Sequence, residues 1–189
     1  MVSRFRWFDK GESDRGKYAC KEEFVSVFES ERMVLQRLAL LLTANTEAAE
    51  RCLALALQEC IASSSVSKDW VLAWARRVVI RNAANLVMEM KGNAERGSIV
   101  FTEDGSLSQI ANFEAILALP DLDRLVFVIC ILECHSVQDC ALLLERPPRE
   151  VIEARRRATD QFKEMDQSND GLLRLGDGSA QIVRNGGAR

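Results

Sequence analysis

The chain has 189 residues, which leaves room for one ordinary domain or two small ones. Apolar residues make up 48% of it and charged residues 28%, with ten glycines and three prolines, so we expect a globular, mostly helical protein and not a β-sandwich or barrel. The net charge of -3 argues against strong non-specific binding of nucleic acid by the whole surface, but it does not exclude a local basic face.

No apolar run approaches the ~18 residues of a membrane span, and the charged start of the chain does not look like a signal peptide. We therefore expect a cytoplasmic protein with no membrane partner, whose cysteines are free core thiols. These are Cys20, Cys52, Cys60, Cys130, Cys134 and Cys140. Their spacing around the single histidine, His135, fits no common zinc site, and the sequence offers no catalytic Ser/His/Asp or Cys/His pair and no phosphate loop. We expect no metal, no cofactor and no enzymatic activity.

The first half predicts three helices after an irregular arm over residues 1–20. The first helix, over residues 20–43, has an apolar stripe formed by Phe24, Phe28, Leu35, Leu38 and Leu42. The second begins after an N-cap at Asn45 or Thr46, runs to about Ala62, and buries Ala49, Ala56, Cys60 and either Leu53 or Cys52.

A serine-rich loop precedes the third helix, which we expect over residues 69–91. Its inner stripe is Leu72, Ala75, Val79, Ala83, Leu86 and Met90. Arg77, Arg81 and Asn85 share another face, which is either a solvated surface or the docking site of an anionic partner. Trp70 and Trp74 are expected to pack in the core and on the domain surface, the alternative being that they are platforms on which bases stack. Periodicity is then lost over residues 94–109, where we place a linker between two domains.

The second half predicts short helices that end in a long basic one. Residues 110–117 form one helix, and Pro120 opens the next, with Leu122, Leu125, Ile129 and Leu132 facing inward. Ser136 and Asp139 form a capping box before a helix that buries Val137, Cys140, Ala141 and Leu144. Pro147–Pro148 start the last helix, with Val151, Ala154, Ala158 and Phe162 inward, and residues 165–189 are predicted to be disordered.

Two short helices joined by a tight turn, the second opening with an arginine, are typical of a helix-turn-helix. The stretch resembles region 4 of the sigma-70 family in its small extracytoplasmic-function form. The matching residues are Leu119–Pro120, 126–133 (VFVICILE), Ser136, Ala141, Leu143–Leu144, Val151 and Arg157–Ala158. The first half is similar to sigma region 2 at Leu42–Thr43, Asn45, Glu47, Ala49, Glu50, Trp70, Ala75 and Arg76.

The resemblance implies an all-α protein of two small helical domains. It places a three-helix region-2-like domain at residues 20–93 and a region-4-like helix-turn-helix domain at 110–164. It also implies a transcription initiation factor that binds core RNA polymerase and promoter DNA, with an anti-sigma factor as a further partner.

The family pattern assigns roles to positions in both domains. Polymerase binding falls on Glu47, Glu50, Arg51, Ala54 and Leu55. DNA binding falls on Ser64, Lys68, Arg76, Arg77 and Arg81 in the first domain, and on Arg149, Ile152, Glu153, Arg155 and Arg156 in the second.

The sequence departs from the family where acidic docking residues are usual, because it has Ala48, Arg51, Ala54 and Leu55 there. Glu153 would repel phosphate and is spaced to pair with Arg149 and Arg157. Two alternatives therefore stay open. One is a helix-turn-helix regulator that binds DNA without core polymerase, and the other is a protein-interaction module that docks through the apolar second-helix face.

Overall fold

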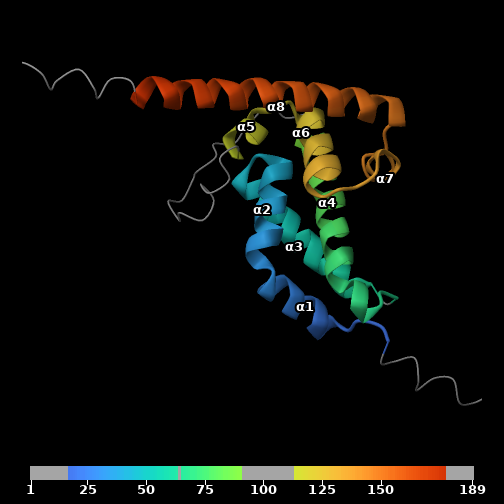
Figure 1. Ribbon diagram of the computed structural model, residues 1–189. Helices are drawn as coiled ribbons and strands as arrows, with labels where there is room; N and C mark the ends of the chain where they lie inside the picture. The colour runs from blue at the N-terminus through green and yellow to red at the C-terminus, as the bar shows by residue number, and fades with distance from the viewer. Residues whose placement is uncertain (1–16, 64, 91–112, 178–189) are drawn as a thin grey trace, which may run out of the picture. The chain divides into compact units, whose positions relative to one another are not determined.

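The computed structural model describes residues 17–63, 65–90 and 113–177. The chain divides into two compact units, Met1–Glu103 and Asp104–Arg189, so the division falls among residues outside the description. The predicted linker 94–109 and most of the predicted arm lie outside it too. Every regular element of the described ranges is helical, which confirms the all-α expectation (Figure 1). Among these residues no helix is both long and apolar enough to cross a membrane.

The first unit contains α1 (Lys21–Ser30), α2 (Arg32–Thr43), α3 (Thr46–Ala62), a short 3-10 helix (Lys68–Trp70) and α4 (Val71–Met90). The prediction of one helix over residues 20–43 was wrong, because the chain breaks at Glu31, where φ is -101°. The residues at the break, Ser30, Glu31 and Arg32, are polar and stay at or near the surface, so packing does not require the helix to be continuous there. The change of direction lets Phe24 and Leu35, each 1% exposed, both enter the core.

Small residues bring the helices of the first unit close together. The buried face of α3 is Ala48, Ala49, Cys52, Ala56 and Cys60, and α3 packs against both α2 and α4 (Figure 1). The predicted α4 stripe is buried at Ala75, Val79, Ala83 and Leu86. Val78, Ile80, Ala84 and Val87 are buried as well, because α1, α2 and α3 cover α4 from several sides.

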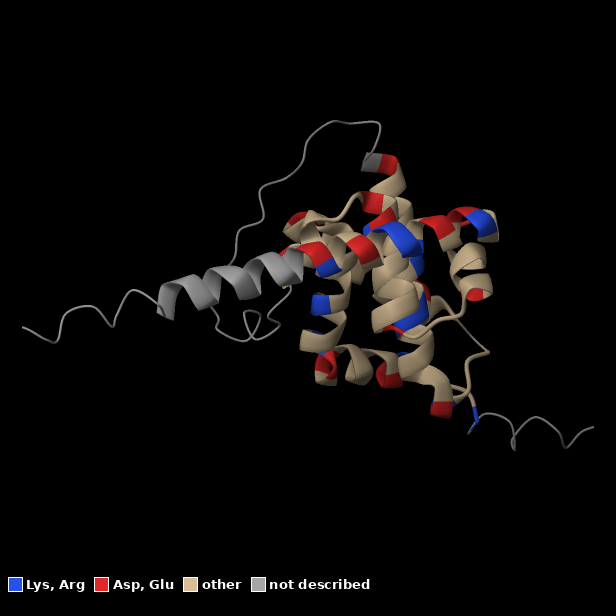
Figure 2. Ribbon diagram, turned by 45° about the horizontal axis from the view of Figure 1, so that its top comes forward, with Lys and Arg blue, Asp and Glu red and all other residues tan. Residues whose placement is uncertain are grey.

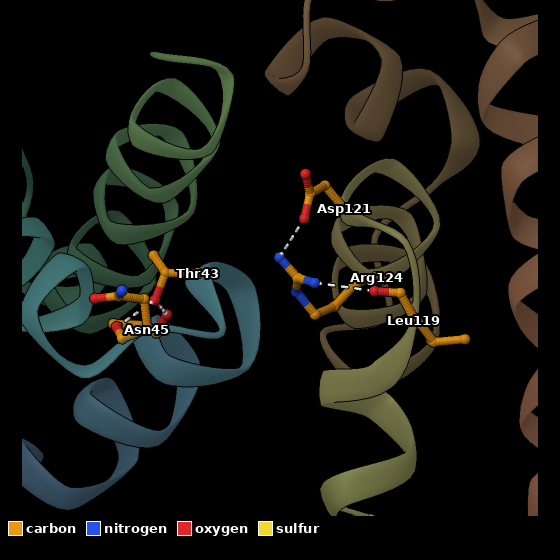
Figure 3. Close-up of polar contacts among 6 residues, drawn as sticks. Thr43, Asn45, Leu119, Asp121 and Arg124 are labelled. Atoms are coloured by element: carbon orange, nitrogen blue, oxygen red, sulfur yellow. Dashed lines mark hydrogen bonds and ion pairs between the residues drawn. The ribbon is translucent and has the colours of Figure 1, made fainter. Parts of the chain in front are cut away.

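The α2–α3 corner is fixed by side-chain hydrogen bonds to the backbone. Ala44 takes the left-handed conformation, with φ 50°. The Thr43 hydroxyl donates to the Ala39 carbonyl at 2.9 Å, and the Asn45 carbonyl lies 3.0 Å from the same hydroxyl (Figure 3). Asn45 caps α3 by accepting the Ala48 N–H at 2.8 Å. Of the two predicted N-cap residues, Asn45 is therefore the cap, as expected of a short polar acceptor in extended backbone.

The second unit contains α5 (Phe113–Ala118), α6 (Asp121–Phe127), a π-helix (Val128–Leu132), α7 (Val137–Leu143) and α8 (Pro148–Asp177). In the π-helix the Glu133 N–H donates to the Val128 carbonyl, five residues back, at 2.9 Å. The wider turn shifts the helical register. Leu132, which was predicted to face inward, is 43% exposed, while Val128 and Cys130 are buried.

Helix α8 packs along α6 through small residues. Val151, Ala154 and Ala158 are fully buried, as predicted, and the Phe162 ring lies 5.0 Å from that of Phe127. The helix continues to Asp177, past the predicted end of order at residue 165, so the glycines at positions 171 and 176 do not end it there.

Candidate functional surfaces

Helices α7 and α8 form a helix-turn-helix in which both ends of α7 are capped by hydrogen bonds. Ser136 caps α7: its oxygen accepts the Asp139 N–H at 3.0 Å, and its hydroxyl donates to the Asp139 carboxylate at 2.6 Å. At the other end of α7, Glu145 takes the left-handed conformation with φ 51°, and the Arg146 N–H donates to the Ala141 carbonyl at 3.0 Å. This is a Schellman ending, which satisfies the last carbonyls of α7 before Pro148 opens α8.

The solvent-facing side of α8 carries all five second-unit residues predicted to bind DNA. Arg149, Ile152, Glu153, Arg155 and Arg156 are exposed, whereas Val151 and Ala154, which alternate with them, are buried. Five arginines and two glutamates lie between positions 146 and 157, so this surface is positive in a chain of net charge -3. Basic and acidic positions intersperse along the described part of the helix (Figure 2).

Intrahelical ion pairs neutralise part of that charge. Glu153 accepts from Arg149 at 3.2 Å, as predicted, and Glu150 lies 3.8 Å from Arg146. Within the ranges whose side chains are described, Arg155 and Arg156 have no ion-pair partner. These two arginines are the cations of α8 best placed to meet an external anion.

Arg157 holds α8 to α6 and does not point to an external partner alone. It was predicted to pair with Glu153, but its guanidinium binds Asp123 of α6 through two hydrogen bonds, of 2.7 and 3.0 Å. The Asp123 side chain is 4% exposed and that of Arg157 is 46% exposed. The hydrogen bond to Asp123 raises the pKa of Arg157. The pair joins α6 to α8, and no local sequence signal indicates it, because its members are 34 residues apart.

A buried arginine, Arg124, stabilises the start of α6. Arg124 is 4% exposed, and its guanidinium donates to the Leu119 carbonyl and to Asp121, each at 3.0 Å (Figure 3). It therefore fastens the α5–α6 corner and leaves α8 as the basic surface of this unit.

In the first unit, the predicted DNA-binding cations lie on or next to α4. Arg77 and Arg81 are exposed, as is Asn85, and Arg76 is half-buried. Arg81 forms an ion pair with Glu59 of α3, and Lys68 pairs with Glu23 of α1 at 2.8 Å. Ser64 lies outside the described residues. Glu23 and Glu59 were not singled out from the sequence, because each lies on a helix other than that of its partner.

The predicted polymerase-binding residues share one exposed face of α3. Glu47, Glu50, Arg51, Ala54 and Leu55 are all exposed, with Leu55 at 37%. Ala48, however, is 6% exposed and packs inside the unit. The interpretation that Ala48 replaces an acidic docking residue was therefore wrong, because its helical phase matches that of buried Cys52, one turn further on.

The aromatic and sulfur side chains correct two further expectations. Trp70 is 66% exposed and so does not pack, while Trp74 is half-buried. Four cysteines are buried, but Cys20 and Cys134 are exposed, the latter at the left-handed turn after the π-helix. In the described ranges no three His, Cys, Asp or Glu residues come together in a way that could hold a metal ion.

Comparison with known proteins assigns no relative to this arrangement: no protein-family model and no curated protein matches the sequence. Two surfaces remain as the functional candidates. One is the arginine-bearing outer side of α8 in a helix-turn-helix, and the other is the mixed acidic and apolar face of α3.

Proposed function

We propose that the chain is a transcription initiation factor of the sigma-70 kind that acts in the cytoplasm. In this proposal the first unit docks on core RNA polymerase and faces the promoter minus-10 element, while the second unit grips the minus-35 element. The observation that carries the proposal is the positive outer side of α8, presented by a capped helix-turn-helix in a chain that is negative as a whole. The resemblance of both units to sigma regions 2 and 4 supports the assignment.

The exposed side of α8 offers both kinds of contact that a recognition helix needs. Arg155 and Arg156 can hold phosphates, which gives affinity without sequence information. Ile152 is 56% exposed, and an apolar side chain there suits a thymine methyl group in a major groove. Glu153 opposes phosphate binding and also holds Arg149 at 3.2 Å. We therefore expect weaker DNA binding by this helix than its exposed arginines would give alone.

The α3 face supports docking on a protein. Its first turns carry Glu47 and Glu50, and the next turn carries Ala54 and Leu55. Mixed acidic and apolar surface is suited to a partner that presents both basic and apolar groups. Core RNA polymerase is the proposed partner, and an anti-sigma factor would compete for the same face.

The test is capture of core RNA polymerase by the immobilised full chain at low salt. We expect the wild type to retain polymerase and Leu55→Glu to retain more, because the substitution adds a carboxylate to the docking face. Gln138→Glu on α7 is the matched control, since it adds the same charge to an exposed helix position of the other unit. Ala48 is unsuitable for this purpose because a carboxylate there would be buried. Retention of no polymerase subunit would remove the proposal.

A second candidate is a protein-interaction module that works without polymerase. The exposure of Ala54 and Leu55 on α3 favours it, because an apolar docking patch is what such a module needs. The same variant separates the two, since Leu55→Glu should weaken an apolar interaction and strengthen polymerase capture. DNA binding with no polymerase capture would indicate instead a helix-turn-helix regulator.

A further inference from the structure

The segment that leads into α1 is fastened to the segment that leads into α4. The Ala19 N–H donates to the Val66 carbonyl at 2.7 Å, and the Lys68 N–H donates to the Lys17 carbonyl at 3.1 Å. Tyr18 and Ser67 form the antiparallel bridge between them. Ala19 and Val66 are each 8% exposed, so both paired segments contribute a buried side chain to the first unit's core.

A side-chain contact strengthens the same junction. Glu23, on the first turn of α1, accepts from the Lys68 ammonium at 2.8 Å through one carboxylate oxygen and from the Cys20 N–H at 2.8 Å through the other. The hydrogen bond with Lys68 lowers the pKa of Glu23, and the same bond raises the pKa of Lys68. Both groups are therefore ionised together near neutral pH. The Glu23 side chain remains 33% exposed and that of Lys68 46% exposed, so solvent and ions reach the pair.

From this geometry we propose that residues 17–20 together with Glu23 form an autoinhibitory clasp on the nucleic-acid face of the first unit, in which the Glu23 carboxylate occupies Lys68 as a DNA phosphate would. The inference rests on the proposed function, in which the first unit faces the promoter minus-10 element and Lys68 is one of the residues expected to bind DNA. A carboxylate and a phosphate cannot share one ammonium at full strength, and the backbone pairing keeps Glu23 next to Lys68. DNA binding through Lys68 therefore requires the Glu23 contact to break.

The size of the effect follows from the exposure of the pair. A solvated ion pair of this kind changes an equilibrium by roughly twofold to fivefold, and salt screens it. Glu23→Gln keeps the shape of the side chain but removes its charge. We expect it to tighten binding of a fluorescein-labelled single-stranded DNA oligonucleotide of mixed sequence by that factor at low salt, with the gain shrinking as salt rises.

The neighbouring Glu22 supplies a matched control. It is exposed on the same turn, and the ion pair with Lys68 does not involve it. Glu22→Gln changes the net charge by the same amount and should leave the affinity within experimental error of wild type. In a Lys68→Met background, Glu23→Gln should give no gain.

Three results would overturn the clasp. The first is equal tightening by Glu22→Gln and Glu23→Gln, which would make the effect one of net charge. The second is a gain that persists without the lysine, and the third is no binding of the oligonucleotide by wild type or any variant. Polymerase capture is measured separately, so failure of the clasp and failure of the proposed function give different results.

Discussion

The Asp123–Arg157 pair allows a quantitative prediction, because its two members are buried to different degrees. Asp123 is 4% exposed and Arg157 is 46% exposed. Removing the arginine leaves a carboxylate without its counter-ion inside the unit, which costs about 3–5 kcal/mol for a buried pair. Removing the carboxylate's charge leaves an arginine that can turn to water. That change costs only about 1–2 kcal/mol, on the scale of lost hydrogen bonds.

We therefore predict that Arg157→Met lowers the free energy of unfolding of the second unit far more than Asp123→Asn does. Since water can follow into a half-exposed site, Arg157→Met should lie at the lower end, about 3 kcal/mol. The double variant should be more stable than Arg157→Met alone, because the orphaned charge is gone.

Urea titration of the full chain followed by circular dichroism measures this effect. All three tryptophans precede residue 104, so tryptophan fluorescence reports the first unit and serves as an internal control. Its midpoint should stay fixed while the transition of the second unit moves. Equal costs for the two single variants, or additive costs in the double variant, would refute the asymmetry on which the reasoning depends.

Three further predictions concern the outer side of α8, the turn that precedes this helix, and the core thiols. Arg156→Ala should weaken binding to promoter and random duplexes alike, and should flatten the slope of log affinity against log salt concentration by about one unit. Glu153→Ser should tighten binding. Fluorescence anisotropy across a salt series measures both, and no change in either variant would show that α8 does not bind DNA. Glu145→Gly should raise the free energy of unfolding by about 1 kcal/mol, because φ there is 51°, and a loss of stability would contradict the left-handed turn. Burial raises the pKa of Cys52 to about 12 and that of Cys60 to about 11, so a thiolate-specific reagent at neutral pH should label the exposed thiols of Cys20 and Cys134 first. Cys52 and Cys60 should react measurably only as the pH approaches those values or as the first unit unfolds. Early labelling of Cys60 would contradict its burial.

The parts of the fold that follow from local chemistry could be predicted from the sequence. Asn45 and Ser136 cap helices because each offers a short side-chain acceptor to the first-turn N–H groups, and Pro148 opens α8. The inward positions of α8 follow from its spacing, since Val151, Ala154 and Ala158 are its small or apolar residues at i, i+3 and i+7. The expectation that Arg149, Ile152, Glu153 and Arg156 lie on the opposite, exposed side of α8 is confirmed.

What was missed depends on register and on distant contacts. The continuous apolar run at 126–132 gives no sign of an i+5 turn, so the exposure of Leu132 could not be read from periodicity. The partners Glu23 and Lys68 are brought together by tertiary structure, and so are Asp123 and Arg157. Ala48 was assigned to docking by resemblance alone, although its phase places it in the core.

The central claim, that this chain directs RNA polymerase to promoters, is tested most directly by transcription in vitro. Core RNA polymerase from the organism that encodes the chain would transcribe a library of its genomic fragments with and without the protein, and the 5′ ends of the products would be sequenced. We predict discrete start sites that appear only when the chain is added and that share upstream sequence elements. An unchanged pattern of transcript ends, with the chain folded and in excess over polymerase, would contradict the claim.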